Sequence, residues 1–290
     1  MYYRSFFVGS EDPYLVVGRH DLDDLLSIDY CETNIAVEMD ALEALRFFPN
    51  TKKLVILPGE VKGLDTSFLK DMRIESLKLD YYSDEIDEYA VDLRSFPHLK
   101  FLSTRTSRNY VFLPSCRGLE TLVVQEWLED DLCTISGSTI VTLNLTGGRS
   151  RSLAGVESLP VLRALSISYQ RRLTDVSCMS RCDRLEGLRI EKCPKVDLTA
   201  LPALPELQLI YLSANAPVEN IDFLKRSPKL RYCILDVKIR DIDLDYLKKM
   251  EHCVVTKGPR WLTADDSGLP RIRDFSRVVS GSPVFRATLC

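Results

Sequence analysis

The sequence lacks the features that mark exported, membrane-embedded and nucleic-acid-binding proteins. The N-terminal stretch MYYRSFFVGSEDPY contains only a three-residue apolar run, too short for a secretory signal. No segment approaches the roughly 18 consecutive apolar residues of a membrane-spanning helix. The 42 acidic side chains outnumber the 38 basic ones, so no overall positive field attracts a nucleic acid or an anionic membrane. We therefore expect a cytoplasmic protein that binds neither nucleic acid nor membranes.

Leucine is abundant where these signals are missing. The chain contains 43 leucines among 290 residues, a proportion typical of leucine-driven repeats. An apolar triplet with the spacing L-x-x-L-x-L recurs ten times at intervals of 20 to 25 residues, and 28 of the 30 framed positions are apolar. The triplets are Thr51/Leu54/Ile56, Ile74/Leu77/Leu79, Leu99/Leu102/Thr104, Leu119/Leu122/Val124, Ile140/Leu143/Leu145, Leu162/Leu165/Ile167, Leu185/Leu188/Ile190, Leu207/Ile210/Leu212, Leu230/Cys233/Leu235 and Met250/Cys253/Val255.

Each triplet predicts one short strand, because its last two apolar residues are two apart, as on the buried face of a strand. Between triplets a second apolar set, such as Val176, Met179 and Cys182, has the spacing of three that suits a helical or 3-10 return. A strand and a return of about 22 residues cannot bury an apolar face alone, so neighbouring units must stack on one another. The sequence therefore predicts an α/β solenoid.

The chain resembles the leucine-rich-repeat family, in the class with repeats of roughly 22 residues. The resemblance covers about residues 50 to 255, and three pairs match the family's second element, an acid or Asn before an aliphatic residue: Asp175-Val176, Asp197-Leu198 and Asn220-Ile221. It implies a curved, right-handed horseshoe with a parallel β-sheet on the concave face and short helices or 3-10 turns on the convex face. The family's Asn or Cys, three residues after each triplet, fits only at Cys193 and Asn215, so we expect an irregular horseshoe.

Residues 1–50 and 256–290 lie outside the ten repeats and are interpreted as caps, because terminal repeats need a covering element. The first segment contains DLDDLL and MDALEALRFFPN, which suit helical turns, around a possible strand at Ile35 to Val37. The expected organisation is an N-terminal cap (1–50), about ten repeats (51–255) and a C-terminal cap or tail (256–290). Apolar residues in the tail are Pro259, Trp261, Leu262, Pro270, Phe275, Val278, Val279 and Phe285.

Strand residues that alternate with the apolar positions are expected on the concave surface. In the last repeats these residues combine aromatic, aliphatic and charged side chains, the usual composition of an interaction hot spot. The candidate partner-binding patch consists of Arg189, Glu191, Leu209, Tyr211, Tyr232, Ile234, Asp236 and His252. The alternative is that residues 256–290 fold back and bury this patch.

A second candidate surface lies on the loops that follow the strands, where consecutive repeats align side chains along one rim. Its arginines suit an acidic partner or an anion. The residues are Arg105, Arg108, Arg149, Arg151, Tyr169, Arg171 and Arg172. Acids at positions 126 and 129–131 interrupt the series, so a mixed, solvated rim is the alternative. The acidic segment DYYSDEIDEYAVD is either a solvated insertion or a contact for a basic partner.

Signals for catalysis, metals and cofactors are weak. Cys253 follows His252, but adjacent strand residues point to opposite faces, so a nucleophile–base pair is not expected. The Gly147-Gly148 loop lacks the Lys-Ser/Thr of a phosphate-binding loop. We expect no enzyme activity, no metal, no cofactor and no small-molecule substrate. The cysteines that could ligate zinc are Cys178, Cys182 and Cys193, of which the last two fall at inward positions where cysteine packs as a small apolar residue.

Recognition of another protein through the concave face and its rim is the predicted function. Two specific forms stay open. One is a stoichiometric inhibitor or immunity protein that neutralises a cognate toxin or enzyme, which suits a chain with no second functional domain. The other is a substrate-recognition or adaptor subunit of a larger complex.

Overall fold

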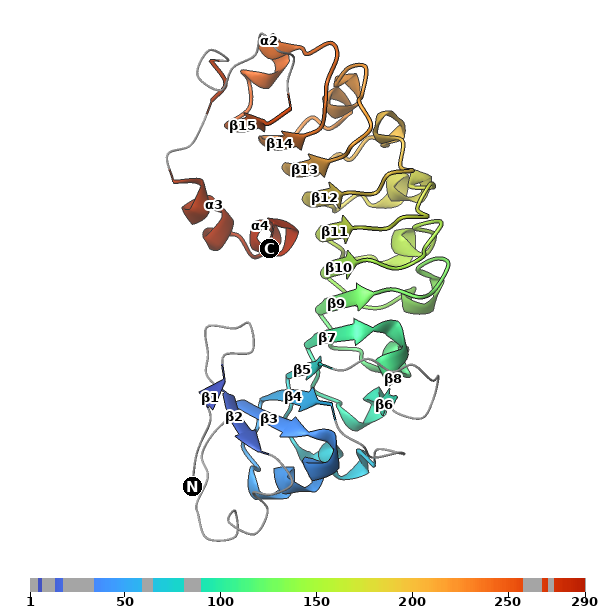
Figure 1. Ribbon diagram of the computed structural model, residues 1–290, viewed down its shortest axis with the longest axis vertical. Helices are drawn as coiled ribbons and strands as arrows, with labels where there is room; N and C mark the ends of the chain where they lie inside the picture. The colour runs from blue at the N-terminus through green and yellow to red at the C-terminus, as the bar shows by residue number, and fades with distance from the viewer. Residues whose placement is uncertain are drawn as a thin grey trace. The chain divides into compact units, whose positions relative to one another are not determined.

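The structure, a computed structural model, describes residues 5–6, 14–17, 34–58, 65–80, 90–257, 268–270 and 274–289 (Figure 1). The chain divides into two compact units, Met1–Val124 and Gln125–Cys290, and the division falls within strand β9 (Thr121–Glu126). Several predicted features lie outside the described residues: the DLDDLL segment, residues 81–89 of the acidic segment, Pro259, Trp261 and Leu262.

The first unit contains a mostly parallel sheet. Strand β3 (Asn34–Glu38) corresponds to the strand predicted at Ile35 to Val37. It pairs in parallel with β4 (Lys53–Leu57), which is followed in chain order by β5 (Ser76–Leu79) and β7 (Phe101–Thr106). On the other side of β3 lie β2 (Tyr14–Val17), which is parallel, and β1 (Ser5–Phe6), which is antiparallel to β2. A separate two-stranded sheet joins β6 (Val91–Asp92) to β8 (Tyr110–Val111).

Six strands of the second unit pair in parallel, one after another. They are β10 (Thr142–Thr146), β11 (Ala164–Ser168), β12 (Gly187–Glu191), β13 (Leu209–Ser213), β14 (Tyr232–Asp236) and β15 (His252–Val255). The central residues of the predicted triplets are direct partners across these strands: Leu143, Leu165, Leu188, Ile210, Cys233 and Cys253. This register confirms the prediction of one strand per repeat.

The triplet residues form the core of each unit. Of the 30 framed residues, 29 are buried, and Val255 is half-buried. The two polar members are buried as well, because their hydroxyl groups have partners. Thr51 Oγ1 donates to the carbonyl of Phe48 at 2.7 Å, and Thr104 Oγ1 donates to the carbonyl of Thr106 at 2.9 Å.

The returns are short and mostly 3-10 helical, as the spacing of three predicts. They are η2 (Met39–Phe47), η3 (Ser67–Asp71), η4 (Leu93–Ser95), η5 (Ser107–Asn109), η6 (Leu113–Ser115), η7 (Cys133–Ile135), η8 (Val156–Ser158), η9 (Ser177–Arg181), η10 (Leu198–Ala200) and η11 (Asp222–Arg226). A single α-helical turn, α2 (Leu244–Leu247), follows β14.

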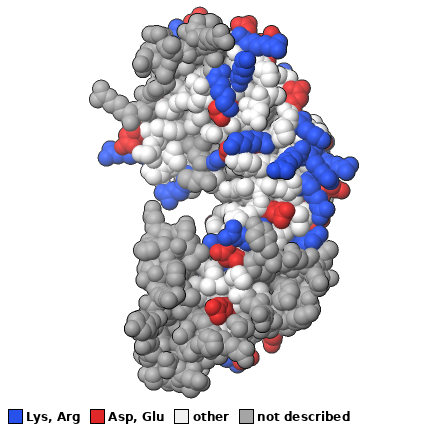
Figure 2. Space-filling model, in the orientation of Figure 1, with Lys and Arg blue, Asp and Glu red and all other residues white. Residues whose placement is uncertain are grey.

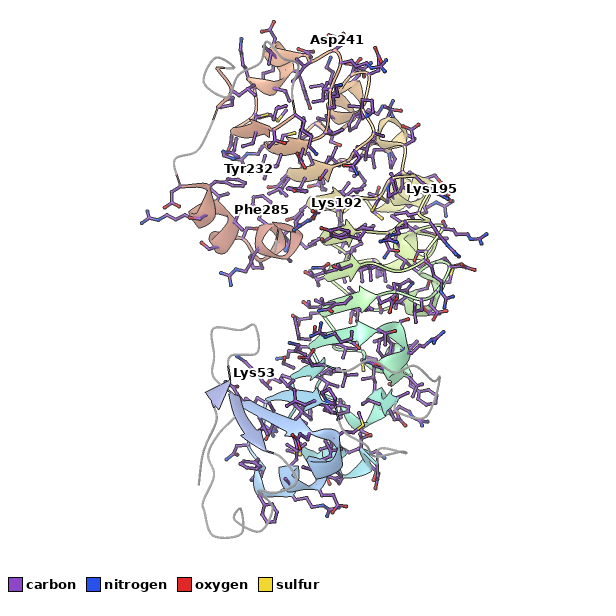
Figure 3. All side chains as sticks on the ribbon, viewed as in Figure 1. Lys53, Lys192, Lys195, Tyr232, Asp241 and Phe285 are labelled. Atoms are coloured by element: carbon purple, nitrogen blue, oxygen red, sulfur yellow. The ribbon has the colours of Figure 1, made fainter. Side chains whose placement is uncertain are left out.

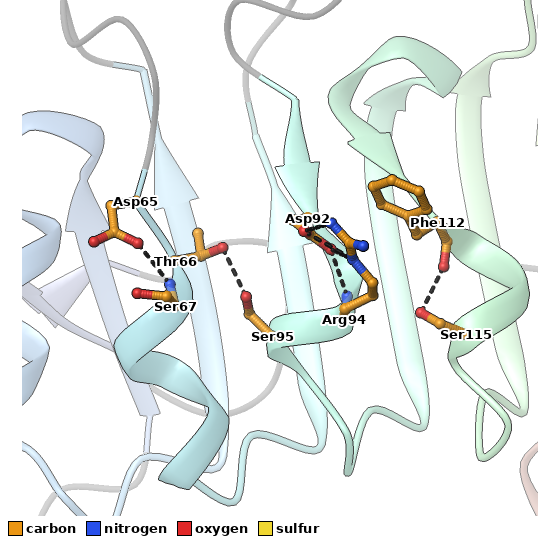
Figure 4. Close-up of polar contacts among 8 residues, drawn as sticks. All are labelled: Asp65, Thr66, Ser67, Asp92, Arg94, Ser95, Phe112 and Ser115. Atoms are coloured by element: carbon orange, nitrogen blue, oxygen red, sulfur yellow. Dashed lines mark hydrogen bonds and ion pairs between the residues drawn. The ribbon is translucent and has the colours of Figure 1, made fainter.

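An Asp or Asn side chain begins seven of these returns. Its carboxylate or amide oxygen accepts a hydrogen bond from the backbone N–H two or three residues later, which replaces a helical partner that the first turn lacks. Figure 4 shows two examples, Asp65 with Ser67 and Asp92 with Arg94. The full set is Asp65, Asp92, Asp131, Asp175, Asp197, Asn220 and Asp243. The family's second element, matched at three positions in the sequence, is therefore the start of the return.

The inward position after the strands differs from the prediction. Asn215, which fits the family pattern, is exposed, whereas Cys193 is buried as expected. Gln170 and Trp127 occupy equivalent positions and are almost fully buried. The Gln170 amide donates to the carbonyl of Gly147, and the Trp127 indole N–H donates to the carbonyl of Asp131 at 2.8 Å. Other polar side chains thus supply the turn's hydrogen bonds where Asn is missing.

The tail contributes two helices, α3 (Phe275–Gly281) and α4 (Pro283–Leu289). Helix α4 packs across β10–β13 on the face of the sheet opposite the triplet core (Figure 1). This face carries the alternating residues that the sequence assigns to the concave surface.

Candidate functional site

Strands β12 and β13 bring three of the predicted patch residues together. Arg189 and Tyr211 are direct partners in the register. The guanidinium of Arg189 forms an ion pair with Glu191 Oε2 at 2.5 Å and lies over the Tyr211 ring, 4.9 Å from its centroid. Burial, followed by the Glu191 charge, raises the pKa of the Tyr211 hydroxyl. These three side chains form one half-buried cluster.

The helical tail covers another part of the patch. We expected Leu209, Tyr232 and His252 to be exposed, but the structure buries all three. The ring of Tyr232 packs edge-on against Phe285 with 5.1 Å between centroids, and His252 stacks on Phe275 at 3.9 Å. The alternative that the tail folds back over the patch therefore holds for these three residues, whose apolar surface is removed from water, and not for the other five.

The last two patch residues lie on β14. Ile234 is half-buried. Asp236 accepts hydrogen bonds from Ser213 Oγ at 2.8 Å and from the Thr256 hydroxyl, and forms an ion pair with Lys257 Nζ at 3.1 Å. Because these donors, Thr256 foremost, stabilise the carboxylate, the pKa of Asp236 lies below its usual range. Asp236 is thus held by its own neighbours.

Two of the predicted rim arginines belong to the first unit. Arg105 Nε pairs with Asp80 Oδ1 at 2.5 Å, and Asp80 also lies 3.5 Å from Lys78 Nζ. Arg108 is half-buried, and its backbone N–H donates to Thr106 Oγ1 at 3.4 Å. The charge of Arg105 is therefore matched within its own unit.

The other rim residues lie in the second unit, in the segments that follow β10, β11 and β12. Figure 2 shows that Lys and Arg side chains gather on one side of this unit. Segments 147–151, 169–172 and 192–195 contain six basic residues and no acidic one. We call this surface the basic rim; it consists of Arg149, Arg151, Tyr169, Arg171, Arg172, Lys192 and Lys195, all exposed. Lys192 and Lys195 are labelled in Figure 3.

Most of the basic rim has no matching acid among the described residues. Arg151 lies 3.9 Å from Asp130, and both side chains are largely exposed. Arg149 donates through Nε to the carbonyl of Leu128, an uncharged acceptor. Arg171, Arg172 and Lys195 form no ion pair within the described part of the chain. The acids that interrupt the series in the sequence, at 126 and 129–131, therefore leave most of this charge unmatched.

The backbone of the basic rim is strained at two exposed side chains. Tyr169 (φ 58°) and Lys192 (φ 49°) adopt the left-handed conformation directly after β11 and β12, where Gly147 (φ 74°) stands after β10. Their N–H groups donate to Glu191 and Ser213 carbonyls of the next repeat at 2.8 and 2.7 Å. The left-handed conformation costs a non-glycine residue about 1 kcal/mol or more. The position directly after the strand is thus occupied by glycine in one repeat and by a large side chain in the next two.

Tyr169 and Lys192 also contact each other. The Lys192 ammonium donates to the Tyr169 hydroxyl at 3.1 Å and lies 5.0 Å from the ring centroid. This hydrogen bond raises the pKa of Lys192. Lys192 and Lys195 were not among the predicted rim residues, which were mainly arginines. The position directly after a strand is the signal that identifies Lys192, and Lys195 lies three residues further along the same loop.

The cysteines lie in surroundings that favour the neutral thiol. Burial raises the pKa of Cys182 to about 12 and that of Cys193 to about 11. Cys253 is fully buried in the core, whereas His252 faces the tail, so the two residues lie on opposite faces of β15 as predicted. Within the described ranges there is no group of three or more metal-binding side chains.

The comparisons bear on the fold. The sequence matches no protein-family model, and no curated protein matches it. The structure is similar to a crystal structure of an internalin from Listeria monocytogenes, with a TM-score of 0.53 and 14% sequence identity over 78% of this chain and 68% of that chain. The chain has the leucine-rich-repeat fold.

Two further leucine-rich-repeat structures are weaker matches. Internalin C2 of Listeria monocytogenes has a TM-score of 0.36 and 19% identity over 53% of this chain and 77% of that chain. A leucine-rich-repeat protein of Leptospira interrogans has a TM-score of 0.33 and 10% identity over 83% of this chain and 88% of that chain. Among the described residues of this leucine-rich-repeat chain, no helix has the length and apolar character needed to cross a membrane.

Proposed function

We propose that this chain is a non-enzymatic protein-interaction module whose basic rim contacts an acidic surface of a partner protein. The observation that carries the proposal is Tyr169, an aromatic side chain 44% exposed on a strained backbone among cations. Aromatic and arginine side chains are enriched among the residues that dominate binding energy at protein interfaces. A glycine at this position would relieve the strain, so the tyrosine is best explained by contact with another molecule.

The positive charge of the basic rim supports an acidic partner. The six cations of the rim lie on three consecutive repeats, although the chain as a whole carries a net charge of -4. An arginine binds a carboxylate with two parallel hydrogen bonds, and a local positive surface accelerates association with an acidic partner. Acidic segments of a protein therefore fit this surface.

The test separates binding from folding. Tyr169→Gly should weaken partner binding about tenfold or more, because it removes an aromatic anchor. It should leave the thermal midpoint unchanged or higher, because it removes the left-handed strain. A partner purified on the wild-type chain from native cells is titrated against each variant by isothermal calorimetry, and the midpoints come from circular dichroism.

The control is matched in charge. Arg171→Glu with Arg172→Glu should reduce affinity at least tenfold, with a loss that shrinks at high salt. Arg181→Glu with Arg184→Glu makes the same charge change on and just after the return η9 and should have little effect. Equal losses in the two pairs, or full binding by Tyr169→Gly, would overturn the proposal.

A further inference from the structure

Helix α4 packs on the sheet through a few buried side chains. Its side chains Val284, Phe285 and Thr288 are buried. Val284 and Phe285 pack with Ala164, Leu209 and Tyr232 on the face of the sheet opposite the triplet core, and Thr288 lies beside Gly187. Figure 3 labels Tyr232 and Phe285, which point toward each other from the strand and the helix. Helix α3 contributes the Phe275 ring but has no fully buried residue. A single face of α4 therefore makes most of this contact.

The surface under α4 is shaped by small side chains. A Cβ atom added to Gly187 would lie 2.2 Å from Thr288 Oγ1 and 3.2 Å from Val284 Cγ1, so the helix approaches the strand as closely as a missing side chain allows. Gly187 has no left-handed backbone that would itself require glycine. Ala164 and Ser166 on β11 are also small and buried. Gly187 thus allows the close approach of α4 to the strand.

The strands do not depend on α4 for their own core. Their triplet residues pack on the opposite face, and their backbone groups bond to neighbouring strands in register. The helix, in contrast, depends on the sheet, because a seven-residue helix is marginal in water without tertiary contacts. The sheet can therefore remain folded with α4 released, whereas released α4 loses its helical form.

From this asymmetry we infer that the face of β10–β13 opposite the triplet core is a helix-binding surface and that α4 is its resident occupant. An amphipathic helix of a partner protein binds there by displacing α4. The partner helix presents a small or β-branched residue to Gly187 and an aromatic residue to Tyr232, as Thr288 and Phe285 do. Leu209 and Tyr232, which pack with the buried face of α4, then become partner contacts. This site is separate from the basic rim.

The first experiment measures exchange within the full-length chain. Val284→Asp with Phe285→Asp alters only the tail and should release α4. In hydrogen-exchange mass spectrometry, amides of residues 283–289 should lose protection while those of β11–β13 keep it. A fluorescein-labelled peptide of residues 274–289 should then bind the variant with a micromolar dissociation constant, and bind the wild-type chain at least tenfold more weakly.

The second experiment uses the glycine. Adding Gly187→Ala to the tail variant should abolish peptide binding, because the new methyl group occupies the site of Thr288 Oγ1; a peptide with Thr288→Ala should restore part of it. Gly118→Ala is the matched control, since its Cβ would meet only the Leu99 carbonyl at 3.5 Å.

No peptide binding to the folded tail variant, or equal effects of the two glycine substitutions, would overturn the inference. So would loss of protection throughout β11–β13, since α4 would then be part of the core. A shift to dimers on releasing the tail would replace the partner helix with the tail of a second copy. Because only this chain's own segment is used, failure here leaves the basic rim proposal untouched.

Discussion

At the scale of single residues, backbone spacing in the second unit is set by glycines that stand close to a neighbouring repeat. Gly148 has φ 120°, and a Cβ atom there would lie 2.1 Å from the carbonyl oxygen of Trp127. Trp127 and Gly148 form an isolated parallel bridge, so the two backbones are in direct contact. A side chain at position 148 has to push one repeat away from the next.

Gly148→Ala should therefore lower the free energy of unfolding by about 2 to 4 kcal/mol, the sum of backbone strain and overpacking. Gly137 (φ 75°) is the matched control, because nothing lies within 4 Å of its added Cβ. Gly137→Ala should cost about 1 kcal/mol from strain alone. Urea unfolding followed by circular dichroism measures both, and equal losses would contradict the close-contact explanation.

At the scale of elements, seven of the returns are started by an Asp or Asn side chain. Asp197 Oδ1 accepts from the backbone N–H of Thr199 at 2.9 Å and from its hydroxyl at 2.6 Å. These hydrogen bonds, the Thr199 side chain first, hold the pKa of Asp197 below its usual value. The turn is therefore stabilised by an acceptor and also by a negative charge at the start of η10.

Asp197→Ala should destabilise the chain by about 1 kcal/mol, the usual cost of a lost cap. Asp197→Asn keeps the acceptor oxygen and should retain most of the stability at neutral pH. The comparison is made by thermal unfolding of the two variants beside the wild type. If Asn costs as much as Ala, the charge rather than the hydrogen bond stabilises the return.

Strands and core could be predicted from the sequence because they follow from a local period. The triplet frame identifies residues such as Leu165 and Leu188, and the spacing of three predicts the returns. The covering of Tyr232 could not be predicted in this way. Alternation assigns a side chain to one face of a strand, but what packs on that face depends on a segment far along the chain. The sequence signal for this covering was Gly187 and Ala164, because two small residues on the face opposite the triplet core leave room for a helix.

At the scale of the whole molecule, titrating groups limit stability on both sides of neutrality. Hydrogen bonds in the folded chain lower the pKa of Asp65, Asp92, Asp175 and Asp197 from 3.8. Their contribution is present above the unfolded value and is lost as the pH falls through the lowered values. Burial raises the pKa of Cys116 to about 11 and that of Cys182 to about 12 from 9.0. Their contribution is present below 9.0 and is lost as the pH rises through these values.

We therefore expect a thermal midpoint that is nearly constant between about pH 5 and pH 8, falls below about pH 4 and falls again above about pH 9. Circular dichroism melts across this range give the profile. Asp197→Asn should flatten the acid side, because one of the depressed carboxyl groups is then absent. A midpoint that rises on acidification would show that these carboxylates do not stabilise the fold.

The docking of α4 also sets an order of events during synthesis. Neighbouring strands join residues about one repeat apart, so each can pair soon after it leaves the ribosome. Thr288 meets Gly187 only after about a hundred further residues have been made, a far longer loop closure than that between neighbouring strands. Leu209 and Tyr232 are therefore uncovered on every nascent chain until α4 has been made, and for that interval they are open to chaperones or to any helix already present.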